Sequence, residues 1–388
     1  MRPCLPSRSV CLEATLLLHP RSTATVRVSW ILMPRSPAAH DERTVPMRAP
    51  SNPDCFQVLL LQLADEGRAE VLLGDAAARA RNTCLPFVVG KNFPDVYFEF
   101  PLAGNPFLDV TFLYDELEPG THIDSPAAGD VQGLVDWYGS VSREHSQISF
   151  GFELDTSKTA LPQAALHFQP RTSTELVRPF CELAGEPERA DLYLDLAARM
   201  PKGWPLSFFG MFRGRPSSPL RTCGYLNPAE RDACAADPRH LAEVFDAIGF
   251  AAYNDAMLDQ VSQVMRAAPS TIDFQFDVYS DGHLSDVFAL DVQYGIEQPE
   301  AVRNSFATGP AGEVMSLLQN MGAADERWKV APGATFARGL PITRDDGTPD
   351  KLALTLMPQW SKARWRNGTL QPAKLYFLGK ATLTSTIS

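Results

Sequence analysis

Five pairs of segments along this chain alternate apolar and polar residues with a period of two, as β-strands with one buried face do. Between the two members of each pair lies a short stretch of turn-forming residues, such as Asn367-Gly368. This pattern predicts five β-hairpins, at 96–100 with 107–114, 148–155 with 164–169, 206–213 with 220–226, 272–279 with 287–294, and 352–365 with 370–378.

Between the hairpins the apolar period changes to about 3.6 residues, which predicts helices. We expect them at 130–144, 175–184, 188–200, 238–248, 254–268, 300–307 and 312–321, with a weaker pair within 55–80. Asn254 is the expected N-cap of its helix. Two helices followed by two strands therefore recur about every 60 residues, a spacing typical of modular architecture.

Ten antiparallel strands in an open sheet would leave two unpaired edges, which closure removes. We therefore predict an α+β fold: a ten-stranded antiparallel β-barrel with a polar lumen, surrounded by paired α-helices in ααββ repeats. The helices would cover the apolar face, and the polar faces would meet inside. Residues 47–388 would form this single domain. The alternative is an open sheet whose polar face meets solvent.

Two segments carry a family resemblance, GFELD at 151–155 and LPQAALHF at 161–168, followed by an acid-rich helical stretch. Together with the order of elements, they resemble the ABBA prenyltransferases, and most closely the cyanobactin TruF/PatF branch that modifies peptides. The local likeness covers about a third of the chain. The resemblance implies a PT-barrel that transfers an allylic prenyl group from a diphosphate donor to a peptide or a small aromatic or nucleophilic acceptor, in the biosynthesis of ribosomal peptides.

The same resemblance implies roles for particular side chains. Glu99, a strand glutamate early in the barrel, matches the residue that orients or deprotonates the acceptor; otherwise it is an ordinary solvated glutamate. Cationic and phenolic groups would hold the diphosphate as its C–O bond ionises. The candidates are Arg213, Arg221, Lys362, Arg364, Lys374, Tyr225 and Tyr376. Further side chains expected in the lumen, facing the acceptor, are Tyr97, Glu153, His167, Gln275 and Gln293.

The predicted lumen is also rich in acids, which would repel a naked diphosphate unless Mg²⁺ or pairing with the bases offsets them. They are Asp109, Glu153, Asp155, Asp273, Asp277 and Asp291. This acidic load favours a competing hypothesis, a non-catalytic barrel that binds a small ligand or a leader peptide as an accessory protein of a natural-product pathway. Pairing with the bases is the simpler role for any single acid.

Bulk properties exclude other classes of partner. Bases alternate with indoles in 360–366, as in single-stranded nucleic-acid platforms, but the formal net charge of −11 opposes nucleic-acid binding. No apolar run approaches the ~20 residues that span a bilayer, so we expect a soluble, cytoplasmic protein. The seven cysteines have neither C-x-x-C spacing nor a Cys/His cluster, and we predict no metal site and no disulfide framework.

Residues 1–46 differ in composition from the rest of the chain, being rich in arginine, proline and serine. The run Leu16-Leu17-Leu18 is short for a signal peptide and has Glu13 close by. We expect this segment to be disordered, or to be an overextended gene start with Met47 as the natural initiator.

Overall fold

The computed structural model describes residues 47–48, 50–65, 67–145, 147–156, 163–213, 218–343 and 347–384. Three sequence expectations lie wholly or partly outside these residues. They concern residues 1–46, residues 214–217 of the turn expected at 214–218 between the strands of the third hairpin, and the first two residues of the segment 161–168.

All five predicted hairpins are present, and each pair of strands is antiparallel. The strands are β2 (Asp95–Pro101) with β3 (Asp109–Tyr114), β4 (Ser149–Asp155) with β5 (Ala165–Gln169), β6 (Leu206–Met211) with β7 (Leu220–Tyr225), β8 (Ile272–Val278) with β9 (Leu284–Gln293), and β11 (Pro349–Arg366) with β13 (Lys374–Thr384). A two-residue strand, β12 (Thr369–Leu370), pairs with the end of β11. Asn367 and Gly368 both have positive φ, 48° and 71°, as the two-residue turn requires.

The strands close into a barrel because β11 pairs on both sides. Its residues 360–366 pair with β9, and its residues 351–362 pair with β13, which in turn pairs with β2. Within the described residues this ring contains the ten predicted strands, all antiparallel to their neighbours. The closed barrel of the sequence analysis is confirmed, and the open sheet is wrong.

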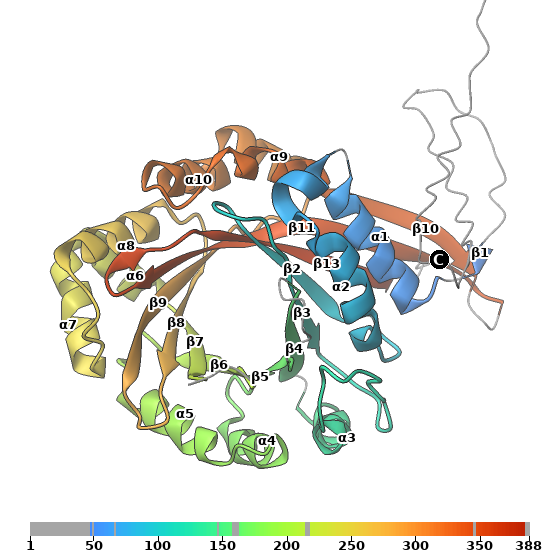
Figure 1. The fold of residues 1–388 in the computed structure, drawn as a ribbon, viewed down its shortest axis with the longest axis horizontal. Coiled ribbons are helices and arrows are strands. Elements are labelled where there is room, and N and C mark those ends of the chain that lie inside the picture. Colours follow the sequence, from blue (N-terminus) through green and yellow to red (C-terminus); the bar gives the residue numbers. More distant parts are fainter. Residues whose placement is uncertain are drawn as a thin grey trace, which may run out of the picture. The chain divides into compact units, whose positions relative to one another are not determined.

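Helices surround the ring of strands (Figure 1). They are α1 (Asn52–Ala64), α2 (Ala76–Cys84), α3 (Gln132–Val141), α4 (Val177–Leu183), α5 (Glu188–Arg199), α6 (Pro228–Ala236), α7 (Pro238–Ile248), α8 (Asp255–Ala267), α9 (Pro299–Thr308) and α10 (Pro310–Asn320). Asn254 caps α8 by accepting a hydrogen bond from the Met257 amide at 2.9 Å, as expected. Among the described residues, one helix precedes the second hairpin and three precede the fourth, so the helices are not strictly paired.

The apolar face of the barrel packs against this helical layer. Phe98 of β2 and Phe112 of β3 are fully buried, and their rings lie 5.9 and 5.7 Å from that of Phe56 on α1. Phe168 of β5 stacks on Phe180 of α4 at 4.4 Å. Burial of such aromatic side chains supplies most of the stabilisation of the layer. The alternate residues of the same strands are thereby directed into the barrel.

An extension of the same sheet continues the barrel wall beyond the ring (Figure 1). It contains the first half of β11, the last residues of β13, β10 (Phe336–Thr343) and β1 (Met47–Arg48), which pairs with β10 in parallel. Leu340, Ile342, Leu352 and Leu354 form its own apolar cluster with Cys55 of α1. The sequence analysis did not predict this extension.

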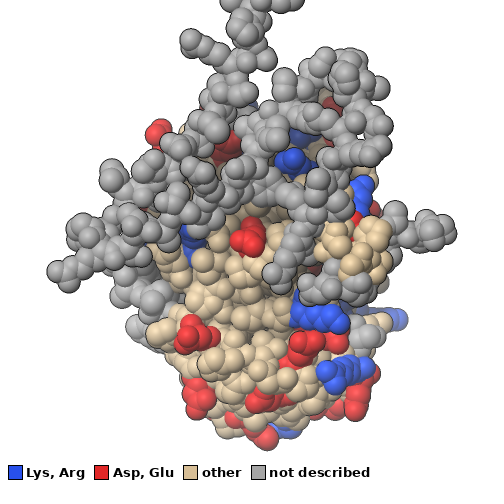
Figure 2. All heavy atoms as spheres, turned by 90° about the vertical axis from the view of Figure 1, so that its right-hand side faces the viewer, with Lys and Arg blue, Asp and Glu red and all other residues tan. Residues whose placement is uncertain are grey.

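No helix in the described part of the chain is both long and apolar enough to cross a bilayer. Figure 2 shows acidic and basic side chains interspersed on the described part of one face, with no continuous basic area there.

Candidate active site

The polar face of each strand points into the barrel, and strand register decides which side chains meet. Lys362 on β11 stands opposite Asp291 on β9 and opposite Lys374 on β13. One step along the strands, Tyr376 stands opposite Glu99 on β2, which stands opposite Asp109 on β3. Side chains from distant parts of the chain are thus brought within reach of one another.

Lys374 connects Glu99 and Asp109. Its Nζ contacts the carboxylate of Glu99 and lies 3.3 Å from Asp109 Oδ2. Burial opposes ionisation of Glu99, but the charges of Lys374 and Lys362 outweigh it and hold its pKa below the usual value. Burial raises the pKa of Asp109 to about 8, although Lys374 opposes the shift. Glu99 is therefore a carboxylate at neutral pH, whereas Asp109 is mostly protonated.

A second ion-pair group surrounds Arg221 on β7. Its Nε lies 3.2 Å from Asp277 Oδ1, and its Nη1 lies 4.0 Å from Glu153 Oε2. His167 Nε2 contacts the same Glu153 oxygen at 3.0 Å. The guanidinium carbon also lies 4.1 Å from the ring centroid of Phe212. Burial would lower the pKa of Arg221, but Asp277 and Glu153 raise it, so the cation is firmly retained.

Lys362 lies between these two groups. Its Nζ donates a hydrogen bond to Gln275 Oε1 at 3.1 Å and lies 3.5 Å from Asp291 Oδ1. Burial raises the pKa of Asp291 to about 6 against the opposing charge of Lys362. The sequence-based expectation that Gln275 faces the lumen fits this contact, because Gln275 is buried and bonded to a lumen lysine.

Gln293 donates a hydrogen bond to Asp273 near Tyr225. Gln293 Nε2 donates to Asp273 Oδ2 at 2.9 Å, and Tyr225 is the register partner of Asp273. Burial, followed by repulsion from Asp291, raises the pKa of Asp273 to about 7. Burial likewise raises the pKa of Tyr225, with Asp273 as the second cause, so its phenol is protonated at neutral pH.

Arg364 is the exception among the lumen bases. Its side chain forms no ion pair with any described residue, and its Nε is buried without a hydrogen-bond partner. Burial and the nearby charge of Arg221 lower its pKa. A buried cation without an ion-pair partner destabilises the fold unless a bound anion neutralises its charge.

Aromatic rings line the barrel beside these bases. The ring of Trp360 lies 4.8 Å from that of Tyr97 and stacks on Tyr376 at 5.2 Å, and Lys362 Nζ lies 5.1 Å from the Tyr376 ring. Of the two tyrosines that the sequence analysis proposed here, Tyr376 lies beside Lys362 and Tyr97 lies beside Trp360, a residue that the sequence analysis did not propose for this site. Trp365 points to the opposite face, where it packs near Phe288, so residues 360–366 do not present their indoles on one surface.

Arg213 differs in position from the other proposed diphosphate-binding residues. It follows the end of β6, and its Nη2 donates to the carbonyl oxygen of Ala128 at 2.8 Å. Burial lowers its pKa, and its Nε has no hydrogen-bond partner. The structure brings Arg221, Lys362, Arg364 and Lys374 together but does not bring Arg213 into contact with them.

Acids outnumber bases in the barrel. Among the described residues, the seven carboxyl groups named above, counting Glu99, face the four bases Arg221, Lys362, Arg364 and Lys374. Asp95, Arg366 and Lys380 share these polar faces, and Asp95 pairs with Lys380. Three of the four bases pair with acids, which is the structural role that the sequence analysis considered for those acids. The raised pKa values of Asp109 and Asp273 further reduce the negative charge at neutral pH.

Neither a family model nor a curated protein matches the chain. Among solved structures, 5-dimethylallyltryptophan synthase from Streptomyces coelicolor is similar at 12% sequence identity, over 85% of this chain and 97% of that chain, with a TM-score of 0.49. The prenyltransferase PriB has 13% identity over 86% of this chain and 96% of its own, with a TM-score of 0.47. AnaPT from Neosartorya fischeri has 11% identity over 84% and 90%, with a TM-score of 0.43. Such values say nothing about what this chain binds.

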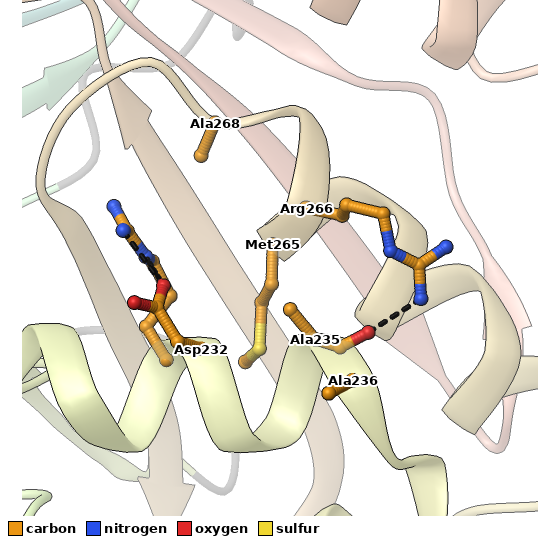
Figure 3. A pocket seen from close by; sticks show the side chains of 7 residues that line it. Asp232, Ala235, Ala236, Met265, Arg266 and Ala268 are labelled. Carbon is orange, nitrogen blue, oxygen red and sulfur yellow. Dashed lines mark hydrogen bonds and ion pairs between the residues drawn. The ribbon is translucent and has the colours of Figure 1, made fainter.

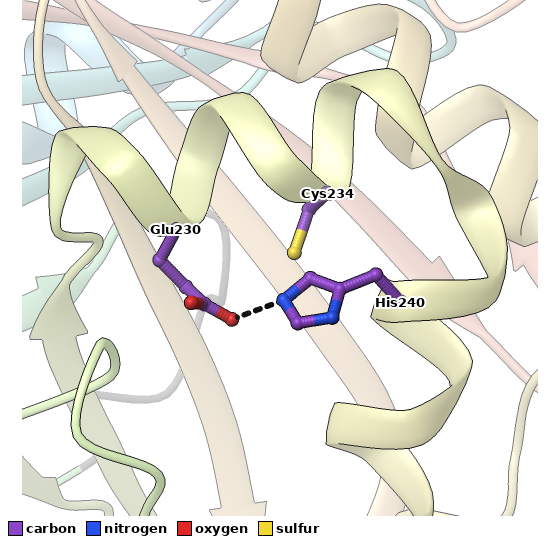
Figure 4. Close-up of side chains that lie close together, drawn as sticks. All are labelled: Glu230, Cys234 and His240. Carbon is purple, nitrogen blue, oxygen red and sulfur yellow. Dashed lines mark hydrogen bonds and ion pairs between the residues drawn. The ribbon is translucent and has the colours of Figure 1, made fainter.

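Sequence reasoning also missed a cluster outside the barrel. Glu230 and Cys234 on α6 lie beside His240 on α7, and Figure 4 shows the three side chains pointing toward one another. The search for C-x-x-C spacing could not find it, because the three residues are four and six positions apart and α6 was not predicted. A helical spacing of Glu and Cys at i and i+4, followed by a histidine, is the signal that could have revealed it.

A surface pocket of about 270 Å³ lies between α6 and α8 (Figure 3). Its two arginines are both engaged: Arg231 contacts Asp232 at 2.8 Å, and Arg266 donates to the carbonyl of Ala235. The pocket offers no concentration of charge comparable to that of the barrel, which remains the better candidate site.

Proposed function

We propose that this protein transfers an allylic prenyl group from a diphosphate donor to an aromatic or other nucleophilic acceptor inside the barrel. One observation carries the proposal. Four cations from three strands face the interior beside a group of stacked aromatic rings. The cations are Arg221, Lys362, Arg364 and Lys374, and the rings are those of Tyr97, Trp360 and Tyr376.

The order of side chains along β11 suggests how the diphosphate donor would lie in the barrel. Along β11 the order is Trp360, Lys362, Arg364, so the aromatic side chains precede the cations along the barrel axis. The diphosphate would lie among the cations, with the prenyl chain directed toward the rings. Arg364 could bind an oxyanion without first losing an ion pair, whereas Arg221 and Lys374 would exchange carboxylates for phosphate oxygens.

This arrangement suits cleavage of the C–O bond of an allylic diphosphate. Cations stabilise the negative charge that develops on the leaving diphosphate. The faces of Trp360, Tyr97 and Tyr376 would stabilise the allylic cation and keep water away from it. Burial raises the pKa of Tyr97 and of Tyr376, so both phenols stay neutral and can donate hydrogen bonds to phosphate oxygens.

Glu99 would act on the acceptor. Once Lys374 contacts the diphosphate, the Glu99 carboxylate can accept a hydrogen bond from an acceptor N–H or O–H and take up the proton as the new bond forms. A peptide side chain and a small aromatic molecule both present such a group. The peptide acceptor, and with it a role in the biosynthesis of ribosomal peptides, is the narrower form of the proposal.

Mg²⁺ has a supporting role in this scheme. It is a hard cation that prefers oxygen ligands and accompanies diphosphates. Lumen carboxylates such as Glu99, Asp277 and Asp291 contact bases, so we expect the ion to enter with the donor. It would supply charge neutralisation, while the chain's own cations fix the position of the leaving group.

The excess of carboxyl groups supports a second candidate, a barrel that binds a ligand or a leader peptide without catalysis. An acid-rich interior favours a cationic or neutral ligand over a diphosphate. The two candidates differ in one measurable property, the affinity for an allylic diphosphate.

The test uses dimethylallyl and geranyl diphosphate with Mg²⁺. Calorimetry measures donor binding, and mass spectrometry follows a panel of tryptophan, indoles and peptides for the mass of an added prenyl group. We expect micromolar donor binding and a mass gain. Absence of donor binding would overturn the proposed function and favour the non-catalytic barrel, whereas donor binding without mass gain would exclude transfer to these classes of acceptor.

A further inference from the structure

The cluster formed by Glu230, Cys234 and His240 lies on two consecutive helices outside the barrel. A carboxylate oxygen, the Sγ atom and an imidazole nitrogen all lie within 4.8 Å of one another. Helix α6 ends at Ala236 and α7 begins at Pro238, so a single residue, Asp237, reverses the direction that brings His240 back to α6 (Figure 4).

From this geometry we propose that Glu230, Cys234 and His240 bind a Zn²⁺ ion. Thiolate sulfur, imidazole nitrogen and carboxylate oxygen are the ligands that zinc uses in proteins, and the sulfur disfavours Mg²⁺ and Ca²⁺. Three protein ligands leave a fourth tetrahedral position for water. The His240 side chain is 36% exposed, so this position can open toward solvent, whereas Cys234 is buried.

The distances require only small movements. A tetrahedral zinc site places its donor atoms about 3.3–3.8 Å apart, given the usual metal–ligand distances. Glu230 Oε1 and His240 Nε2 are 2.8 Å apart, so they must separate slightly as the ion enters between them. The Cys234 sulfur lies within 4.8 Å of both other donor atoms, so it must approach by no more than about 1.5 Å, which side-chain rotation can supply.

Outer partners lie beside two of the ligands. His240 Nδ1, the nitrogen that does not face Glu230, lies 3.8 Å from Glu243 Oε2. Trp204 Nε1 donates to Glu230 Oε1 at 3.3 Å, and the Trp204 ring lies 4.9 Å from that of Phe274 on β8. In carboxylate–histidine–zinc arrangements the carboxylate hydrogen-bonds the second imidazole nitrogen, so Glu243, whose side chain is 80% exposed, would have to move closer to His240 to fix the orientation of its ring. Through Trp204, the cluster is also connected to the barrel wall.

The charges balance when the ion binds. The S–H bond of Cys234 breaks and a Zn–S bond forms, and the proton passes to solvent, with no change of oxidation state. The thiolate and the Glu230 carboxylate together neutralise the two positive charges of zinc.

The site would link α6 to α7 and so stiffen this part of the helical layer. It does not touch the proposed donor site, and its test is independent of prenyl transfer.

The experiment titrates the full-length protein, reduced and freed of metal by a chelator, with Co²⁺ and then with Zn²⁺. We expect one cobalt ion to produce a thiolate-to-cobalt charge-transfer band in the near ultraviolet, which Zn²⁺ abolishes by competition. Zinc should also raise the thermal unfolding midpoint. Absence of the band in the wild-type protein would overturn the proposal.

Variants identify the ligands. Cys234→Ala should lose the band, while Cys181→Ala, which removes an equally buried helical thiol on α4, should keep it. His240→Ala alters a partly exposed side chain and should fold, yet weaken zinc binding at least about tenfold. His283→Ala, at an exposed histidine in the β8–β9 turn, should not change it. A band that persists in Cys234→Ala, or unchanged affinity in His240→Ala, would show that Glu230 and His240 only share a hydrogen bond beside a core cysteine.

Discussion

Lys362 of β11 lies directly opposite Lys374 of β13, and both ammonium groups are inside the barrel. Like charges at directly opposed positions are destabilising in a sheet. The two lysines are tolerated because their charges are balanced by different carboxylates, Lys362 by Asp291 on one side and Lys374 by Glu99 on the other, with the mostly protonated Asp109 3.3 Å from Lys374. A bound dianion between them would use both charges at once.

Lys374→Met should therefore destabilise the fold strongly. It removes the ion-pair partner of the buried Glu99, and breaking a buried pair costs about 3 kcal/mol of unfolding free energy. Lys380→Met is the matched control on the same strand. Its side chain is 43% exposed and pairs with Asp95 at 2.8 Å, so the loss should stay below about 1 kcal/mol. Urea denaturation measures both, and equal losses would contradict the assignment of Lys374 to a buried pair.

The raised carboxyl pKa values predict how stability depends on pH. Because the pKa of Asp109 rises from 3.8 to about 8 on folding, the folded state binds more protons than the unfolded state between those values. The free energy of unfolding should then fall as pH increases from about 4 to about 8. The pKa values of Asp273 and Asp291 are raised to about 7 and about 6, so these residues also lower the free energy of unfolding as pH increases, over narrower pH ranges.

Asp109→Asn removes the largest of these contributions while keeping the shape of the side chain. Between about pH 5 and pH 8, the wild-type protein should lose at least about 1 kcal/mol relative to Asp109→Asn. Asp281→Asn, at an exposed turn position, serves as the control and should follow the wild-type slope. Parallel pH profiles for wild type and Asp109→Asn would mean that Asp109 is ionised in the folded protein.

Local sequence signals were sufficient for the hairpins and for the closure of the barrel. Asn367-Gly368 predicted its turn because both positions need positive φ, and the alternation in β8 predicted its two faces. Helix α6 was missed because its buried face consists of Cys234 and Ala235, which give little apolar periodicity. Strand β10 was missed because Gly339 and Pro341 interrupt it, as is common in strands near a sheet edge.

The pairing of charges inside the barrel could not be predicted from the sequence. Lys374 is 275 positions from Glu99, and their contact follows from the register between the last strand and the first strand of the ring. Sequence phase showed that both side chains face inward, but a shift of two residues would have kept that phase and changed every partner. For the same reason, nothing in the sequence distinguished the unpaired Arg364 from the paired Arg221.

The turn between β11 and β12 provides a test of local backbone strain. Gly368 has φ of 71°, and an added Cβ would lie 2.3 Å from Asn254 Nδ2. Gly368→Ala should thus strain the turn and displace the N-cap of α8, lowering the unfolding free energy by about 1–2 kcal/mol. Gly282→Ala isolates the strain, since its φ of 83° is similar and no atom lies within 4 Å of the added Cβ. Equal losses in the two variants would show that the Asn254 contact has no cost.

Substitution of Arg364 should affect donor binding without lowering the stability of the fold. Its guanidinium has no ion-pair partner among the described residues, and burial lowers its pKa, so folding gains nothing from its charge. Arg364→Gln should therefore leave the unfolding free energy unchanged within about 0.5 kcal/mol, or raise it.

The same variant should weaken binding of dimethylallyl diphosphate at least about tenfold, corresponding to about 1.4 kcal/mol, because a charge-assisted contact to the diphosphate is lost. Arg178→Gln on the exposed face of α4 breaks only a surface ion pair with Asp191 and should affect neither property. Chemical denaturation and calorimetry on the three proteins supply the comparison. If Arg364→Gln is destabilised like Lys374→Met and binds the donor as the wild type does, Arg364 is a structural cation, and the diphosphate must be held by the remaining three bases or not at all.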